Sequence, residues 1–480
     1  MTGSPALQYI LTGFDDAASS RFSASVAGDT DKARVTSMSV SQWGTVTDAE
    51  FVCFVKSPGT LAPHATSAIL AYFASHPDVD MLFTDESKAD GRASTPVLKP
   101  IYAPERLRTQ DYLGDLVVYR SSLLDAVGGV DDSLPGAELY DLEMRASLAA
   151  RVVGHIDAPL FRRTAGPARL ADDATIKAST RSALERRLAA TGGGEVIAVG
   201  LDGVHDTRRV VDGAPLVSLV IPSRGVFSDI NGERGCYLLD CVRSVMEKST
   251  YSNFEIVVVL DSVADPAVID ELHRVVGDRL VLAEWSKPFN FSDKINLGVL
   301  NASGEYVLML NDDTTVISPG WIEALLALAQ RPGAGMSGAL LFFGDGSIQH
   351  AGHHYFEDDA SHIGLDAAHD EVGPLSGYRV EREVSGVTAA CALMPVRVFH
   401  EVGGLSNLLP GNFNDVDLCM KVGFLGYDIY FTPHAQLYHY ESKTRDASVH
   451  GFEVDVVWTR WGPGMHDPRF WPYPHNRTPD

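Results

Sequence analysis

The fold of this chain is predicted best from one segment, Gly304-Glu-Tyr-Val-Leu-Met-Leu-Asn-Asp-Asp-Thr314. Its apolar run, residues 306–310, is typical of a buried strand, and a polar Asn-Asp-Asp tip follows at residues 311–313. Two earlier apolar runs, at 215–224 and 255–262, also end in polar residues and alternate with segments that predict helices. Continuous Val, Ile and Leu strands alternating with helices indicate a parallel sheet covered on both faces.

Polar side chains follow the carboxyl ends of all three predicted strands. Arg224 follows the first strand, Asp261 the second and the tip at residues 311–313 the third. In open parallel sheets, ligands bind beyond the carboxyl ends of the strands. We therefore expect these side chains to meet at one site.

A similar pattern occurs near the start of the chain without its acidic residues. The apolar run 51–55 is followed by Lys-Ser-Pro at residues 56–58, where the later copy has its Asn-Asp-Asp tip. Matching the two copies gives two further differences, Leu139 in place of Asp415 and Arg162 in place of His439. We interpret the residues that the copies share as scaffold and those that differ as chemistry.

The composition is that of a soluble globular protein, with 45% apolar and 21% charged residues in 480. A net charge of −24 argues against a general nucleic-acid binder, which needs basic surface to displace phosphate counterions. Five cysteines without a CxxC pair predict neither a thiolate metal site nor a disulfide framework, and so favour a reducing cytosol. The start shows no signal peptide, and no apolar run approaches the roughly 20 residues needed to span a bilayer.

With these residues in order, the segment of roughly 215–475 resembles the family 2 glycosyltransferases, and within them the bacterial rhamnosyltransferase-like group. The resemblance rests on short motifs that are weak alone but occur in the family's order, at residues 220–224, 258–262, 289–298, 310–314, 413–419, 438–442 and 460–468. It implies the GT-A fold, a Rossmann-like α/β domain with a mostly parallel sheet and helices on both faces.

The resemblance also suggests how the chain is divided. We expect a degenerate, non-catalytic GT-A-like domain at 1–195, a linker at 196–214, a GT-A catalytic domain at 215–445 and a C-terminal tail at 446–480 packing on it. The degenerate copy is expected to begin near the strand at 51–55 and to lack the nucleotide-binding segment that precedes it in the family.

The donor implied by the resemblance is a nucleoside-diphosphate sugar, held with a divalent metal, Mg²⁺ or Mn²⁺. Asp313 and His439 match the family's metal ligands, and a carboxylate with one imidazole suits these ions. Nucleotide contacts are expected from Pro222, Ser223, Arg224, Asp261, Asn290, Lys294, Asn296, Asn311 and Asp312. A solvated helix face is the alternative for Lys294 and Asn296.

Asp415 matches the family's catalytic base, and Asp417 is its rival. The resemblance implies one displacement that inverts the anomeric centre, so a carboxylate on the acceptor side must take the hydroxyl proton. Asp417 lies two residues after Asp415, so on a helix its side chain points in a different direction from that of Asp415. Its partner Asp141 persists in the first copy, which favours a structural role for Asp417.

Three histidines, His350, His353 and His354, also invite a metal hypothesis. His350 and His354 would share one face of a helix, but Gly352 and the missing carboxylate weaken such a site. We interpret the three as surface or acceptor-cleft residues.

The sequence thus predicts a cytosolic inverting glycosyltransferase that moves a dTDP- or UDP-linked sugar to a hydroxyl of a glycan or lipid-linked saccharide. Peripheral contact with the inner face of the membrane and a homo-oligomer stay open. One alternative is a sugar-phosphate nucleotidyltransferase, although residues 222–225 contain one glycine where a glycine-rich signature is wanted. The other alternative, a non-catalytic glycan-binding or scaffold protein, conflicts with the joint retention of Asp313, Asp415 and His439.

Overall fold

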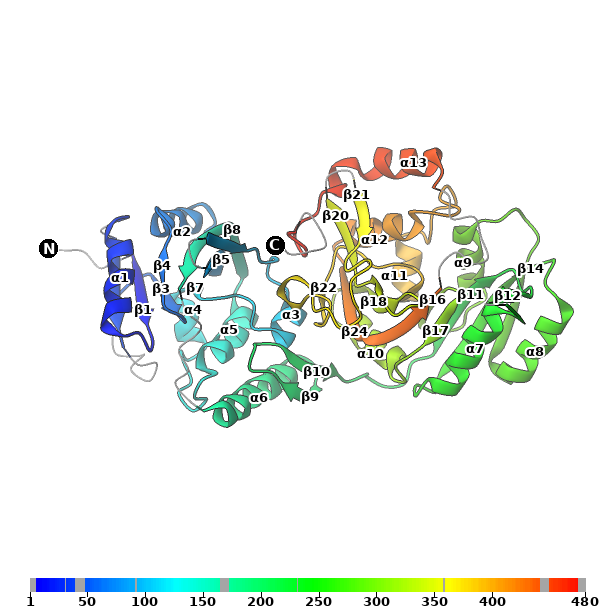
Figure 1. Cartoon of the computed structure of the whole chain (residues 1–480), viewed down its shortest axis with the longest axis horizontal. Coiled ribbons are helices and arrows are strands. Elements are labelled where there is room, and N and C mark those ends of the chain that lie inside the picture. Colours follow the sequence, from blue (N-terminus) through cyan, green and yellow to red (C-terminus); the bar gives the residue numbers. More distant parts are fainter. Residues whose placement is uncertain are drawn as a thin grey trace. The chain divides into compact units, whose positions relative to one another are not determined.

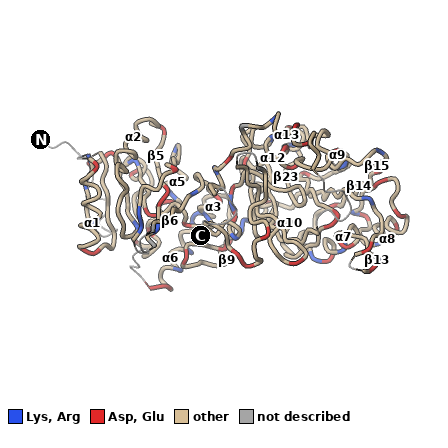
Figure 2. The backbone as a smooth tube through the Cα atoms, turned by 45° about the horizontal axis from the view of Figure 1, so that its top comes forward, with Lys and Arg blue, Asp and Glu red and all other residues tan. Residues whose placement is uncertain are grey.

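The computed structural model describes residues 6–30, 32–38, 48–90, 93–164, 172–230, 232–356, 359–440 and 449–473. The chain divides into two compact units, Met1–Arg208 and Arg209–Asp480 (Figure 1). Within the described residues, no helix is long and apolar enough to cross a membrane. Acidic and basic residues are interspersed along both units (Figure 2).

The second unit is built on one mixed sheet. Its main strands, in spatial order, are β15 (Leu280–Trp285), β14 (Phe254–Asp261), β11 (Val217–Ser223), β16 (Tyr306–Leu310), β23 (Cys391–Pro395), β18 (Ala334–Phe342), β24 (Asp428–His439) and β17 (Thr314–Val316). The strands β15, β14, β11 and β16 are parallel to one another, as the apolar runs predict. The sheet becomes mixed because β23 runs antiparallel to both of its neighbours, whereas β18 and β24 are parallel.

Short strands extend the sheet or form hairpins beside it. β19 (Ile348–His350) pairs with β18, and β22 (Arg382–Glu383) pairs with β24. Two separate hairpins are β12 (Ser228–Ile230) with β13 (Glu233–Gly235), and β20 (His353–Phe356) with β21 (Asp359–His362).

Helices cover both faces of this sheet. They are α7 (Tyr237–Lys248), α8 (Pro266–Val276), α9 (Phe291–Leu300), α10 (Trp321–Ala329), α11 (Val396–Glu401), α12 (Asn414–Phe424) and α13 (Gly451–Trp461), with short 3₁₀ turns η2 (Gly277–Arg279), η3 (Pro374–Ser376) and η4 (Gly462–Met465). α7, α8 and α10 pack their apolar faces against alternate residues of β11, β14 and β16 in one large core. α9 lies on the opposite face, where a Cβ on Gly298 would come within 2.3 Å of Val220. Glycine at this position therefore lets the helix approach the sheet closely.

The first unit repeats the strand order of the second. Its elements are β1 (Leu7–Leu11), α1 (Asp16–Ala27), β2 (Ala33–Ser37), β3 (Phe51–Val55), β4 (Gly59–Leu61), α2 (Ala65–Ser75), β5 (Val79–Asp90), β6 (Ala93–Val97), α3 (Pro104–Thr109), β7 (Leu116–Arg120), α4 (Ser121–Ala126), α5 (Glu138–Ala149), β8 (Val152–Arg163) and α6 (Asp173–Ala190). The path β2-β1-β3-β7-β5-β8-β4 has the same order of parallel and antiparallel neighbours as β14-β11-β16-β23-β18-β24-β17.

One expectation about the first unit needs correction. The copy does not begin at β3, because β1, α1 and β2 occupy the places that β11, α7 and β14 hold in the second unit. The segment 196–214, expected to be a linker, contains most of β9 (Gly194–Val199) and all of β10 (His205–Arg209), which pair with each other, and the boundary between the two units falls within this segment. The sequence indicates a short strand at residues 7–11, where β1 lies, but one short apolar run does not show that this strand belongs to the copy.

The end of β3 in the first unit is filled by ion pairs. Lys56 Nζ lies 2.6 Å from Glu143 Oε1 and 2.9 Å from Asp111 Oδ1. Ser57 donates a hydrogen bond to Asp115, at 2.6 Å. Side chains of this unit therefore neutralise one another where the second unit carries its acidic tip.

Helix α13 is tied to α12 by one buried carboxylate. The Asp417 side chain accepts a hydrogen bond from Trp461 Nε1 at 2.9 Å, and ion-pairs with Lys421 at 3.1 Å and with Arg460. Val457 and Met465 of this C-terminal region pack with Val416 in a separate small core. Residues 474–480 of the expected tail lie outside the described residues.

Asp417→Asn is expected to lower the free energy of unfolding by about 2–3 kcal/mol, because an amide leaves two cations without their counter-charge. Denaturant unfolding of the full chain measures the change. Asp455→Asn, at an exposed position of α13, is the matched control and should stay within about 0.5 kcal/mol of the parent. Equal stability of Asp417→Asn and the control would show that the carboxylate does not hold the two helices together.

Candidate active site

A cavity of about 470 Å³ lies beyond the carboxyl ends of β11 and β16. Among its lining residues are those of the β11 turn, the tip after β16, the start of α12 and the β20–β21 hairpin: Pro222, Ser223, Arg224, Lys294, Asn311, Asp312, Asp313, Gln349, His353, His362, Asn414, Asp415 and His439. Most of the side chains predicted from the strand ends are therefore gathered in one place.

One corner of the cavity joins Asp313 to His439. The β17–β24 register places His439 opposite Thr314, and its Nε2 atom lies 3.2 Å from Asp313 Oδ1. The other ring nitrogen, Nδ1, lies 2.7 Å from Gln349 Oε1. A carboxamide oxygen only accepts, so Nδ1 carries the proton and Nε2 presents its lone pair. Asn311 Nδ2 donates to this lone pair at 3.1 Å.

This corner has the donor set of a small divalent-metal site. A carboxylate and a correctly oriented imidazole suit Mg²⁺ or Mn²⁺, and both side chains are buried. Gln349 orients the histidine in the way that second-shell partners do at metal sites. Sequence analysis did not single out Gln349, because it lies 90 residues from His439 and only the sheet brings the two together.

Gln349→Leu is expected to weaken Mn²⁺ binding about 10- to 100-fold, because His439 then loses the bond that fixes its tautomer. Titration of Mn²⁺ by electron paramagnetic resonance, without donor or acceptor, measures this directly. Gln330→Leu, in the same unit and bonded to Asp212, is the control. Unchanged Mn²⁺ affinity of Gln349→Leu would remove Gln349 from the metal site.

Asp312 lies deeper and is bonded to the end of β11. Ser223 Oγ donates to its Oδ2 at 2.5 Å. Burial, and then the adjacent charge of Asp313, raise the pKa of Asp312 to about 7. The negative charges of Asp312 and Asp313 therefore repel each other, and a bound cation would relieve this repulsion.

Lys294 cross-links two strand ends. Its Nζ donates to Ser223 O at 2.7 Å and to Asp261 Oδ1 at 2.8 Å. The side chain is buried, so the alternative of a solvated helix face is wrong. Burial lowers the pKa of Lys294. The lysine thus fixes Asp261 beside the β11 turn and places one positive charge at the wall of the cavity.

Two residues predicted to contact a nucleotide lie elsewhere. Asn290 caps α9, where its Oδ1 accepts from Asp293 N at 3.0 Å, and its amide donates to Asn407 O. Asn296 exchanges two hydrogen bonds with the backbone of Leu405, at 2.9 and 3.0 Å. Neither lines the cavity, so both predictions are corrected: these amides hold α9 to the segment after α11. Asp261 does not line the cavity either, and is bonded to Lys294, which does.

Asp415 lies in the first turn of α12 and faces the same cavity. Phe413, with φ of 57°, precedes this turn in the left-handed conformation. Asp415 Oδ2 accepts from Ala389 N at 3.3 Å and lies 3.9 Å from His353 Nε2. Burial raises the pKa of Asp415, but the nearby His353 and His362 outweigh it and the net shift is downward. The carboxylate is therefore ionised at neutral pH and able to accept a proton.

The three expected histidines are not on a helix or on the surface. His350 ends β19, whereas His353 and His354 begin β20, and all three are buried. His353 pairs across the hairpin with His362, which the sequence analysis did not single out. The register of a hairpin brings these rings together, and the spacing along the chain does not reveal it.

Similarity to known proteins agrees with this geometry. Residues 227–401 match the family model described as Glycosyl transferase family 2. The chain is 31% identical over 417 residues to "O-antigen biosynthesis protein RfbC" of Myxococcus xanthus, covering 83% of this chain and 31% of that protein. It is 32% identical over 439 residues to "Uncharacterized protein y4gI" of Sinorhizobium fredii, covering 86% of this chain and 47% of that protein. The chain thus spans less than half the length of these relatives.

Solved structures with partial likeness include "Crystal structure of GalNAc-T7 with UDP, GalNAc and Mn2+". It has a TM-score of 0.42 and 13% identity, over 54% of this chain and 50% of that one. The second unit is an α/β domain whose cavity lies at the strand ends. By these matches, the second unit contains a family 2 glycosyltransferase domain, with the GT-A fold.

Proposed function

We propose that the second unit transfers a sugar from a nucleoside-diphosphate sugar to an acceptor hydroxyl, with inversion of the anomeric centre. The observation that carries this proposal is that Asp313, His439 and Asp415 line one cavity. Two candidate metal ligands, Asp313 and His439, and the ionised carboxylate of Asp415 lie on separate elements. This arrangement fits a reaction that needs both a stabilised leaving group and a base.

The residues at the β16 tip fit a divalent cation. Asp313 and His439 would hold it, and its chemistry is to stabilise the negative charge that builds on the departing diphosphate. Arg224 is exposed on the cavity wall and places a further positive charge there. Pro222, Ser223 and Asp261 surround the place proposed for base and ribose.

Asp415 acts as the base in this proposal. An acceptor hydroxyl gives its proton to the carboxylate while its oxygen forms the bond to the anomeric carbon. The bond from that carbon to the diphosphate oxygen breaks, and the electron pair leaves with the diphosphate. Asp417 is not the base, because its carboxylate is fully buried against α13.

The acceptor is proposed to be a glycan or lipid-linked saccharide in cell-surface polysaccharide synthesis. The similarity to a protein named for O-antigen biosynthesis supports this class. All five cysteines are buried free thiols, which is compatible with a reducing cytoplasm. The first unit is proposed to be a non-catalytic copy of the second, supported by the shared strand order.

The proposal is tested with a panel of UDP-, dTDP- and GDP-sugars. A bound donor should raise the melting temperature in the presence of Mn²⁺ by mass action, and EDTA should abolish the shift. Release of nucleoside diphosphate with an added saccharide then measures transfer. A donor that stabilises the protein without any turnover, with or without Mn²⁺, would instead support a glycan-binding or scaffold protein.

A further inference from the structure

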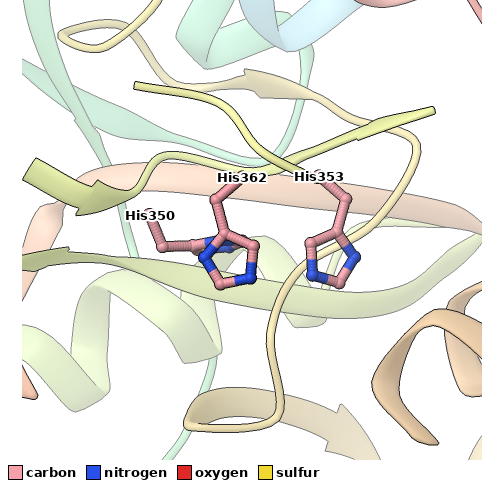
Figure 3. Close-up of side chains that lie close together, drawn as sticks. All are labelled: His350, His353 and His362. Atoms are coloured by element: carbon pink, nitrogen blue, oxygen red, sulfur yellow. The ribbon is translucent and has the colours of Figure 1, made fainter. Parts of the chain in front are cut away.

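We propose that His350, His353 and His362 form a second metal site, separate from the Asp313–His439 corner, for a borderline cation of the Zn²⁺ type. One nitrogen from each ring lies within 4.8 Å of the other two. The rings come from β19 and from the two strands of the β20–β21 hairpin, and they converge on one spot (Figure 3).

The separations are close to those of a coordinated set. Nitrogens bound to one Zn²⁺ at about 2.1 Å in a tetrahedron are roughly 3.4 Å apart. The longest separation here, at most 4.8 Å, shrinks to this value by small ring rotations. His353 and His362 are directly opposed across the hairpin, with ring centroids 5.3 Å apart. An antiparallel ladder therefore holds two of the ligands in register.

Hydrogen bonds at the outer nitrogens orient two of the rings. His353 Nδ1 lies 2.9 Å from the Tyr355 hydroxyl, and His362 Nδ1 lies 3.2 Å from Gln349 O. A carbonyl only accepts, so the proton of neutral His362 is on Nδ1. This is the arrangement of metal-bound histidines, in which one nitrogen coordinates and the other donates to a second-shell acceptor.

The side chain of His350 accepts one long hydrogen bond. Its Nε2 accepts from Thr388 N at 3.2 Å, so the proton is on Nδ1, which is buried and has no hydrogen-bond partner in the described part of the chain. An unpaired buried polar group costs about 1–3 kcal/mol. Coordination through Nε2 would take the place of the bond from Thr388 N and would leave the Nδ1 proton as it is.

The surroundings suit a cation. His350 and His353 are buried, so a cation held between the rings would be shielded from bulk water. Asp415 Oδ2, 3.9 Å from His353 Nε2, provides a negative charge beside the site. Three imidazoles with one neighbouring carboxylate favour Zn²⁺, Co²⁺ or Ni²⁺ over Mg²⁺.

The test counts ions on the full chain with Co²⁺, whose visible absorption reports histidine ligation. The wild type should bind two equivalents, and Asp313→Ala should keep the one held by the histidines. In the Asp313→Ala background, His362→Gln should weaken that Co²⁺ site at least about 100-fold, beyond the 10- to 100-fold effect of an outer-shell change. His64→Gln, at an exposed position of the first unit, is the control.

The result is independent of transfer, donor or acceptor. Melting temperatures without metal verify that each variant is folded, and His353→Gln provides a second ligand variant if His362→Gln unfolds. If Asp313→Ala binds no Co²⁺, or if its Co²⁺ affinity is unchanged by both histidine substitutions, the cluster is a packed group of imidazoles and the proposal is overturned. If Asp313→Ala abolishes all Co²⁺ binding, the histidine site is refuted, but the proposed function is not, because that function depends on the Asp313–His439 site.

Discussion

Asp415→Asn is expected to reduce the rate of sugar transfer by about 10²- to 10⁴-fold, the range that a positioned general base contributes. Asparagine has the shape of aspartate but only one acceptor oxygen, so it keeps one of the two bonds that Asp415 accepts from Ala389 N and Val416 N and loses the other. It cannot accept the acceptor's proton, because the amide is not basic. Steady-state release of nucleoside diphosphate in the presence of acceptor measures the loss.

Donor binding separates a lost base from a damaged cavity. The Asp415→Asn protein should bind donor and Mn²⁺ as the wild type does, because Asp415 belongs to α12 and not to the Asp313–His439 corner. Asp16→Asn, also in the first turn of a helix but in the first unit, is the matched control and should transfer at the parent rate. Wild-type transfer by Asp415→Asn would show that another group takes the proton.

Asp313→Ala is expected to abolish both Mn²⁺-dependent donor binding and transfer, with a loss of activity on the order of 10³-fold or more. Of the two proposed ligands, only the imidazole of His439 then remains, and the diphosphate loses the cation that offsets its charge. Binding of donor to the variant is measured by thermal shift with Mn²⁺.

The control is Asp229→Ala, at an exposed position of the β12–β13 hairpin, which removes a carboxylate without touching the cavity. High Mn²⁺ concentration should partly restore Asp313→Ala, because His439 and Gln349 keep their hydrogen bond. Full Mn²⁺-dependent transfer by Asp313→Ala at ordinary metal concentration would contradict the assignment of this carboxylate as a ligand.

The strand ends were the part of the site that the sequence could predict. Apolar runs identify β11, β14 and β16, and the parallel arrangement then forces Arg224 and the tip at residues 311–313 to one edge of the sheet. This inference needs no knowledge of distant pairing, because each polar residue directly follows its own strand.

The remainder depended on pairing between distant segments. Gln349 reaches His439 only because β18 lies between β19 and β24, and His362 meets His353 only through a hairpin register. Asn290 and Asn296 failed as predictions for the opposite reason: they lie on the right helix, α9, but their amides face the segment after α11. Spacing along a chain does not specify which side of a helix meets a ligand and which meets another loop.

The ion pairs at the end of β3 bear on how the first unit can change. A pyrophosphate entering there would meet Glu143 and Asp111, and Lys56 is already engaged by both. Without Glu143, Lys56 would still be paired with Asp111, so a single substitution of Glu143 would not provide a free cation for a diphosphate. Substitutions at these ion pairs should therefore change the amount of folded protein in a cell and leave the turnover per folded molecule unchanged.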